Sequence, residues 1–252
     1  MRSHEGWGGR DVPPDYESQR RRTGRNWPRR SYLGGLPDPL RDELLHVAAP
    51  CQYQSGESLM REGDRSTHVV LLLSGIAKIS ARLDEGHEAL LAIRASGDVV
   101  GEMAAMDGKP RSATVTACGA IRAGVVQKND LHAFFRRHPE AALSMGSVVA
   151  ERLRWANRRR IEFAGYPVKV RLARVLAELA ASHGRPVLQG LVIGVNLSQP
   201  ELAALAGSAE DTVQKALRAL REEGLLTTGH RRISVLDLRR LREIGHLPPG
   251  IA

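Results

Sequence analysis

The chain has 252 residues, with 37 Lys and Arg against 28 Asp and Glu, a formal net charge of +9. A domain takes roughly 100–200 residues, so this length accommodates two compact domains and a tail. Apolar residues make up 42%, enough for a core, whereas 4% aromatics argue against an aromatic-rich RNA platform. No run of about 18 apolar residues occurs, and no apolar stretch follows the Arg-rich start, so we expect neither a membrane span nor a secretory signal.

Charge is unevenly distributed along the chain. Residues 1–30 carry eight Arg and four acidic residues, residues 31–166 are nearly neutral, and residues 167–252 carry 12 basic and eight acidic residues. Basic ends are typical of proteins that bind a polyanion such as nucleic acid, but on charge alone a solvated surface is the simpler explanation.

The cysteine content excludes several kinds of site. Cys51 and Cys118 are too few for a disulfide framework, a four-thiolate iron–sulfur cluster or a structural zinc site. We therefore expect none of these sites and a reducing, cytoplasmic compartment. We assign no metal, while the nine His leave a haem as an alternative.

Residues 1–30 are rich in Gly, Arg and Pro without a sustained period, which predicts a disordered basic tail. Asp38-Pro39 indicates the start of a short helix that runs to about Ala48, with Asp38 as its capping carboxylate. Over residues 50–127, turn signals recur every roughly 7–12 residues, which predicts an antiparallel barrel or roll. These turn signals are Gly56-Glu57, Gly63-Asp64, Ser74-Gly75, Glu85-Gly86 and Gly97-Asp98.

A long helix is predicted after the strands. Asn129 or Asp130 caps a short helix ending near His138, and Pro139 then opens a helical segment to about Ala164. Small and apolar residues recur along it at spacings of four and three, which favours pairing with a second copy over packing on its own barrel. This seam comprises Ala142, Gly146, Val149, Leu153, Ala156, Arg160 and Phe163. Only that narrow stripe is apolar, because four arginines occupy other positions of the helix. They are Arg152, Arg154, Arg158 and Arg159.

The last third begins with a candidate hinge at Gly165-Tyr166-Pro167. A helix over residues 168–182 and a short hairpin within residues 187–195 are expected to follow. Ser198-Gln199-Pro200-Glu201 is a capping box, which predicts a helix to Ala206 that presents Leu202 and Leu205 inward.

A second helix follows after a turn at Gly207. Ser208 is expected to cap it, Val213, Leu217 and Leu220 to share its inner face, and Gly224 to end it. Residues 225–235 then predict a β-hairpin. Two short capped helices joined by Gly and followed by a hairpin are typical of a winged helix-turn-helix, whose second helix enters the major groove of DNA.

Candidate DNA contacts lie on that second helix and its flanks. Lys215 and Arg218 suit phosphate or guanine, and Glu210 suits the cytosine amino group. Alternatively, Glu210 and Asp211 serve only the helix dipole, or the whole unit is an interaction module. The predicted DNA-binding residues are Ser198, Gln199, Ser208, Glu210, Asp211, Thr212, Gln214, Lys215, Arg218 and Arg231, with Arg232 beside them in the wing.

Residues 97–117 contain a candidate anion site. Gly101 permits close backbone approach at a short helix start, Glu102 can accept from a ribose hydroxyl, and Arg111 supplies the fork that matches a phosphate. An internal Glu102–Arg111 salt bridge is the weaker alternative, because the Gly-rich helix start accompanies the pair. The predicted ligand-binding residues here are Gly101, Glu102, Met103, Ala104, Arg111, Ser112 and Ala113.

This stretch closely resembles the phosphate-binding cassette of cyclic-nucleotide-binding domains. With a long helix and a winged helix-turn-helix behind it, the chain over about residues 33–240 resembles the cyclic AMP receptor protein and fumarate–nitrate regulator (CRP/FNR) family of bacterial transcription factors. The implied fold is α+β: a disordered tail over residues 1–30, a cyclic-nucleotide-binding β-roll over 31–138, a dimerisation helix and hinge over 139–165, and a DNA-binding winged helix-turn-helix over 166–252.

The resemblance implies a homodimer that binds a cyclic nucleotide, cAMP rather than cGMP, and reads a palindrome in double-stranded DNA. RNA polymerase is a further implied partner. Glu102 would meet the ribose 2′-hydroxyl, while Arg111 and Ser112 hold the cyclic phosphate. Where cAMP-responsive members present Thr and then Ser or Asn to the adenine, this chain has Ala156 and Asn157, so only Asn157 remains for the base.

Three functions follow from these observations. The leading one is a regulator whose DNA affinity a cyclic nucleotide controls. The second is a family regulator that needs no ligand or answers to another small anion. The third is a nucleotide-dependent interaction module that no longer reads DNA. No nucleophile elbow, Walker loop or HExxH motif is present, so an enzyme is not expected and no catalytic residue is assigned.

Overall fold

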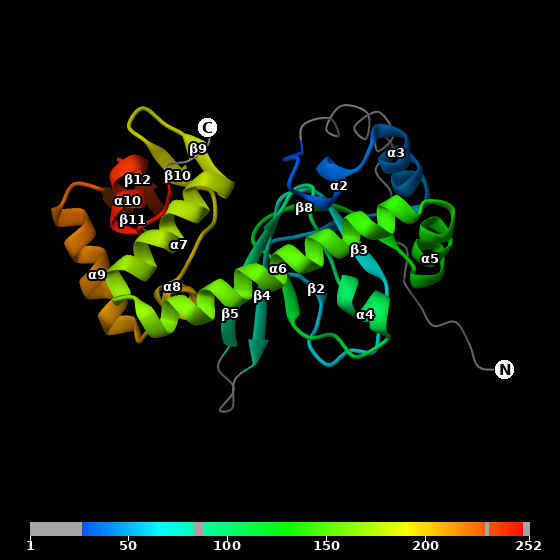
Figure 1. Cartoon of the computed structure of the whole chain (residues 1–252), viewed down its shortest axis with the longest axis horizontal. Helices are drawn as coiled ribbons and strands as arrows, with labels where there is room; N and C mark the ends of the chain where they lie inside the picture. The colour runs from blue at the N-terminus through cyan, green and yellow to red at the C-terminus, as the bar shows by residue number, and fades with distance from the viewer. Residues whose placement is uncertain (1–26, 83–87, 230–231, 249–252) are drawn as a thin grey trace. The chain divides into compact units, whose positions relative to one another are not determined.

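The computed structural model describes residues 27–82, 88–229 and 232–248, and these form two compact units (Figure 1). One unit holds the described residues up to Ala77 together with Arg94–Val148, and the other holds Lys78–Ile93 together with the residues from Val149 onward. Mixed helix and sheet occur in both units. The α+β class predicted from the sequence is therefore confirmed.

Two four-stranded sheets make up the predicted roll. Their orders are β1-β8-β3-β6 and β2-β7-β4-β5, and the described registers of β1 with β8, β3 with β8 and β6, and β2 with β7 are all antiparallel. Glycines with positive φ turn the chain at four predicted positions, Gly56, Gly63, Gly75 and Gly97. The fifth predicted turn, Glu85-Gly86, lies outside the described residues. The strands are β1 (Ala49–Tyr53), β2 (Ser58–Met60), β3 (Val69–Ser74), β4 (Ile76–Arg82), β5 (Glu88–Ala95), β6 (Val99–Val100), β7 (Thr114–Ala117) and β8 (Ile121–Val126).

The core of the first unit forms where helices cover β3. Val69 and Leu71 are fully buried there with Leu131, Phe134 and Met145 from the helices. The helices of this unit are α2 (Tyr32–Gly35), α3 (Asp38–Val47), α4 (Glu102–Asp107), α5 (Lys128–Arg137) and the first part of α6 (Pro139–Gly165). Burial on both faces explains the continuous apolar run of β3, which no alternation of polar residues interrupts.

Three sequence expectations in this unit need correction. The N-cap of α5 is Gln127, with no side-chain cap, so Asn129 and Asp130 lie inside the helix rather than capping it. The N-cap of α3 is Pro37, with no side-chain cap; Asp38 lies inside the first turn and pairs with Arg41 at 2.6 Å instead. The predicted tail falls outside the described residues up to residue 26, but Trp27 packs against the core and its Nε1 donates to the carbonyl oxygen of Leu73 at 3.1 Å. Trp27 therefore belongs to the packed unit.

The second unit contains the predicted winged helix-turn-helix. A sheet of order β11-β12-β10-β9 accompanies its helices, and β11 and β12 form the predicted wing hairpin. The strands are β9 (Gly184–Pro186), β10 (Leu191–Ile193), β11 (Leu226–Gly229) and β12 (Arg232–Val235). The helices are α7 (Val168–His183), α8 (Gln199–Ala206), α9 (Glu210–Glu222) and α10 (Leu238–Ile244).

The long helix α6 is continuous over its 27 residues (Figure 1). Its exposed large apolar side chains are Leu143, Leu153, Ile161 and, to a smaller extent, Phe163. Leu153 belongs to the predicted seam, but Leu143 and Ile161 do not, and Phe163 packs within its own unit. Arg159, expected among the exposed arginines, is 7% exposed. Among the described helices, none is long and apolar enough to cross a membrane.

Candidate ligand cassette and DNA-reading helices

The cassette begins at a glycine that no other residue replaces without strain. Gly101 is the N-cap of α4 with φ +83°, a left-handed conformation that residues with a Cβ adopt at a cost. A Cβ at this position would lie 2.5 Å from Nη1 of Arg111. The glycine therefore lets the backbone at the start of α4 approach the guanidinium directly.

Arg111 is a buried cation with fixed geometry. It is 3% exposed, and its Nε donates to Ser66 Oγ at 3.1 Å, its Nη1 to the carbonyl oxygen of Gly101 at 2.9 Å and its Nη2 to that of His68 at 2.6 Å. Burial lowers the pKa of Arg111, and the carboxylates of Asp64 and Glu102 oppose that shift. Because each terminal nitrogen carries a second hydrogen, the group retains N–H donors for an anion.

The other predicted cassette residues surround this arginine. Glu102, the first residue of α4, is 7% exposed and attracts Arg111 electrostatically. Ala104 is buried, Met103 is exposed, and the exposed Ser112 donates to Met103 Sδ at 3.7 Å. Ala113 is half-buried. The structure thus brings Gly101 and Glu102, at one end of the predicted motif, beside Arg111 at the other. Asn157 lies apart in the sequence as an exposed residue of α6, in the second unit.

His68 is a cassette neighbour that the sequence did not reveal. It is 5% exposed, and its backbone carbonyl accepts from Arg111. Burial, reinforced by the positive charge of Arg111, lowers the pKa of its imidazole to about 4. No motif marks this histidine, because only the fold brings β3 beside the arginine. Near neutral pH, His68 therefore adds no charge to the cassette.

The capping box of α8 is confirmed. Glu201 Oε2 accepts from the backbone N–H of Ser198 at 2.7 Å, and Ser198 Oγ accepts from the backbone N–H of Glu201 at 3.4 Å. Lys78 Nζ also pairs with Glu201 at 2.6 Å and donates to the carbonyl oxygen of Asn196 at 2.7 Å. Burial by itself raises the pKa of Glu201, but the bonds from Lys78 and Ser198 outweigh it and hold the pKa below its ordinary value.

The start of α9 differs from the prediction. Its N-cap is Ala209, with no side-chain cap, and Ser208 lies one residue earlier in the turn. Gly207 ends α8 with left-handed backbone, and the backbone N–H of Ser208 is already bonded to the carbonyl oxygen of Ala203 at 3.0 Å. Ser208 thus completes the end of α8 rather than beginning α9.

The inner and outer faces of α9 follow the prediction. Val213, Leu217 and Leu220 are buried, as are Leu202 and Leu205 of α8. Gln199 is exposed and Ser198 and Ser208 are half-buried. The exposed predicted contacts on α9 are Glu210, Asp211, Thr212, Gln214, Lys215 and Arg218. In the wing, Arg232 is exposed, while Arg231 lies outside the described residues.

The described residues contain no group of three or more His, Cys, Asp or Glu side chains with the arrangement of a metal site.

Comparison with known proteins matches both parts of the chain. Residues 50–138 match the family described as "Cyclic nucleotide-binding domain", and residues 170–244 match the "Crp-like helix-turn-helix domain". The chain is 30% identical over 192 residues to the cyclic AMP receptor protein of Thermus thermophilus. The matched region covers 76% of this chain and 86% of that protein. It is 29% identical over 198 residues to the CRP-like cAMP-activated global transcriptional regulator of Mycobacterium tuberculosis, which covers 79% and 88%.

A solved structure shows the same architecture. A transcriptional regulator of the CRP/FNR family from Thermus thermophilus superposes with a TM-score of 0.68 at 25% identity, over 79% of this chain and 98% of that one. The fold, the cassette and the helix-turn-helix define a transcription regulator with a cyclic nucleotide-binding domain and a DNA-binding domain. The chain belongs to the CRP/FNR family, whose members are regulators rather than enzymes.

Proposed function

We propose that this chain is a homodimeric, cytoplasmic regulator that reads a palindromic DNA site with an affinity controlled by cyclic AMP bound in its roll. The observation that carries the proposal is the buried guanidinium of Arg111, 2.9 Å from the start of α4 and attracted by buried Glu102. A fixed cation beside a carboxylate suits a cyclic phosphate attached to a ribose, since the cation binds the phosphate and the carboxylate accepts from the 2′-hydroxyl.

Roles for the remaining cassette residues follow the same chemistry. Ser112 is exposed, so its hydroxyl is available to a phosphate oxygen once its weak contact with Met103 is exchanged. The amides at Met103, Ala104 and Ala113 complete the phosphate contacts. Asn157 is the proposed partner of the base, because the side chain of Ala156 can neither donate nor accept a hydrogen bond.

The proposed dimer forms along α6. Leu143, Leu153 and Ile161 are 74%, 61% and 70% exposed, an unusual array for an isolated helix in water. Burying such side chains against a second copy of α6 stabilises a coiled-coil-like pair. We propose residues 139–165 as the dimerisation helix, 31–138 as the roll and 166–252 as the DNA-binding domain.

In the proposed DNA complex, α9 lies in the major groove. Lys215 and Arg218 are exposed on it and supply positive charge to phosphate or guanine, and Gln214 and Thr212 supply neutral contacts. Glu210 and Asp211 lie in the first turn of the helix and place acidic groups near DNA. RNA polymerase is the proposed further partner at a promoter.

A ligand-independent regulator is the second candidate, and one specific observation favours it. Arg111 makes three hydrogen bonds to the protein itself, so it is held in place without an anion. In that case the cassette arginine is a structural element of the roll.

Calorimetric titration with cAMP and cGMP separates the two candidates. We expect micromolar binding of cAMP, a loss of about two- to tenfold in Ser112→Ala, where one hydrogen bond is removed, and a larger loss in Arg111→Gln, where the bond is charged. The matched control is Arg122→Gln, an arginine of the same roll that donates to Ser74 Oγ at 3.1 Å outside the cassette. Folded protein that binds neither nucleotide would support the ligand-independent candidate, and a mobility shift on genomic fragments would test DNA reading in either case.

A further inference from the structure

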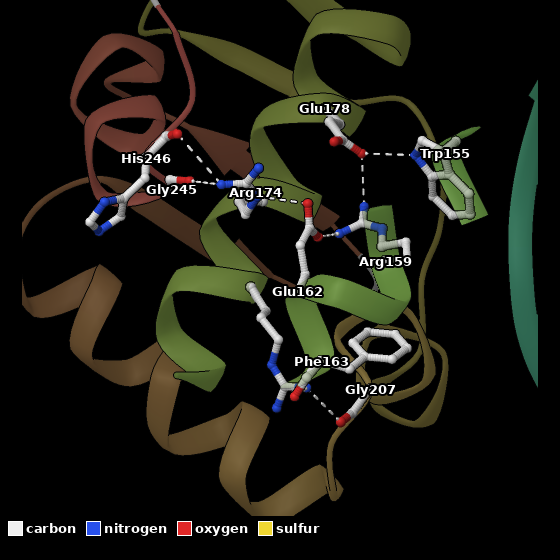
Figure 2. Close-up of polar contacts among 10 residues, drawn as sticks. Trp155, Arg159, Glu162, Phe163, Arg174, Glu178, Gly207, Gly245 and His246 are labelled. Carbon is white, nitrogen blue, oxygen red and sulfur yellow. Dashed lines mark hydrogen bonds and ion pairs between the residues drawn. The ribbon is translucent and has the colours of Figure 1, made fainter. Parts of the chain in front are cut away.

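The last turns of α6 are joined to α7 by a buried cluster of charges (Figure 2). Glu162, whose side chain is 6% exposed, accepts from Arg159 Nη1 at 3.0 Å and from Arg174 Nε at 2.9 Å. Arg159 Nη2 also donates to Glu178 of α7 at 2.8 Å, and Trp155 Nε1 donates to the same carboxylate oxygen at 3.2 Å. The two carboxylates and two guanidinium groups are equal in number, and their mutual attraction offsets part of the cost of removing them from water.

The end of α6, through Phe163, and the start of α7, through Arg171, both contact the turn of the helix-turn-helix. Arg171 Nη1 donates to the carbonyl oxygen of Gly207 at 3.1 Å, and the guanidinium of Arg171 lies 5.5 Å from the centre of the Phe163 ring. Figure 2 shows the Phe163 ring beside Gly207. A Cβ on Gly207 would lie 2.5 Å from a carbon of that ring, so the two residues are in direct contact.

These contacts bridge the candidate hinge at Gly165-Tyr166-Pro167. The guanidinium of Arg174 lies 5.1 Å from the centre of the Tyr166 ring, and its Nη1 donates to the carbonyl oxygen of Gly245, beyond α10, at 2.6 Å. Arg174 of α7 therefore contacts both the candidate hinge, at Tyr166, and the residue that ends α10. The residues after Val148 also belong to one compact unit with the helix-turn-helix.

We infer that Phe163 and Arg171 are positioning residues for DNA reading, because they fix the Gly207 turn, and with it the start of α9, to the end of α6. A displacement of the C-terminal half of α6 then moves α9 with it, instead of being absorbed at residues 165–167. The inference rests on the proposed reading of DNA by α9. It gives the ligand-sensing helix a direct mechanical connection to the DNA-reading helix.

Two glycines provide a matched test of this contact. Gly207 has φ +60° and Gly224, just after α9, has φ +71°, so an alanine strains the backbone similarly at both. Only at Gly207 does the new methyl group meet the Phe163 ring; at Gly224 it meets nothing within 4 Å. Phe163 is 42% exposed, so Phe163→Ala is expected to fold and to remove the contact from the α6 side.

The experiment measures DNA affinity by fluorescence anisotropy, with and without cAMP, on a fragment selected by the wild type. We expect Gly207→Ala and Phe163→Ala to reduce the cAMP-induced gain in DNA affinity at least fivefold, and Gly224→Ala to preserve it. Cyclic AMP affinity should be unchanged in all three. In the Phe163→Ala background, Gly207→Ala should cause no further loss, since the methyl group then has room.

Amide hydrogen exchange of residues 207–209 gives a readout independent of DNA. Exchange should increase in Phe163→Ala and stay at the wild-type rate in Gly224→Ala. Equal behaviour of Gly207→Ala and Gly224→Ala, or unchanged exchange and unchanged regulation in Phe163→Ala, would overturn the inference. A wild type that selects no DNA would instead overturn the proposed function, and the exchange measurement would still decide whether the contact holds the turn.

Discussion

Nη1 of Arg111 donates to the carbonyl oxygen of Gly101 at 2.9 Å, and a methyl group on Gly101 would lie 2.5 Å from that nitrogen. Gly101 and Arg111, the two ends of the cassette, are therefore hydrogen-bonded to each other. The guanidinium, the proposed phosphate-binding cation, can take this position only because residue 101 has no Cβ. A side chain at position 101 would therefore displace the guanidinium of Arg111 and weaken binding of the ligand.

Gly101→Ala should weaken cAMP binding by more than about tenfold, because the methyl group displaces the guanidinium from the cassette. The left-handed backbone adds a folding cost of about 1–2 kcal/mol. Gly56→Ala is the matched control, since Gly56 has the same φ of +83° but no atom within 4 Å of the new Cβ. Calorimetry on both variants isolates the effect of the clash; equal affinities in the two would mean that the position of Arg111 does not govern binding.

Acid should destabilise the protein through His68. Its pKa is about 4 in the folded state against about 6.5 in the unfolded chain, so the unfolded state binds more protons between these values. Stability therefore falls as pH drops from about 6.5 through about 4, by on the order of 3 kcal/mol for this group. Urea unfolding across this range should show a flatter pH dependence in His68→Gln. An imidazole that titrates near 6.5 by NMR in the folded protein would contradict the burial.

Leu153→Arg should dissociate the dimer, because it places a charge in the middle of the apolar stripe on α6. Leu188, which is fully exposed on the loop between β9 and β10, provides the control, and Leu188→Arg should leave the association state unchanged. Sedimentation velocity at micromolar concentration measures both. A Leu153→Arg protein that sediments as the wild type does would place the dimer interface elsewhere.

Lys215→Ala should weaken DNA binding and lower the dependence of affinity on salt. Each neutralised phosphate contributes about −0.9 to the slope of log K against log salt, so removal of one contact should reduce that slope by about one. Arg136→Ala, an exposed cation on α5 in the roll, is the control and should leave the slope unchanged. An unaltered slope in Lys215→Ala would remove this lysine from the phosphate contacts.

The elements with a local signal were predictable from sequence. The capping box at Ser198 and Glu201 specifies the start of α8 because two side chains satisfy two backbone groups reciprocally. The glycine-punctuated strands specify the antiparallel roll, and the cassette motif joins residues close in sequence. Asp38 has no such partner, and Ser208 has only the shorter Asp211 three residues on. At both positions the helix begins one residue away from the predicted start.

Contacts between distant elements were not predictable in this way. Arg159 lies among arginines that look solvated in the sequence. Its buried partner Glu162 is three residues on in the same helix, but the pair is completed only when Arg174 and Glu178 of α7 approach it. His68 likewise becomes a cassette residue only when β3 lies beside Arg111. The position of Phe163 against Gly207 depends on the packing of α6 with the helix-turn-helix. In each case the deciding partner comes from another element of the fold.

The most direct test of the central claim is the DNA affinity of the purified protein in the absence and presence of saturating cAMP. The DNA would be a palindromic fragment selected from random sequence in the presence of cAMP, and a scrambled fragment of equal length would serve as the control. We expect at least about tenfold tighter binding to the selected fragment with cAMP, and no such gain on the scrambled one. Equal affinity for the selected fragment with and without the nucleotide would contradict ligand control of DNA binding.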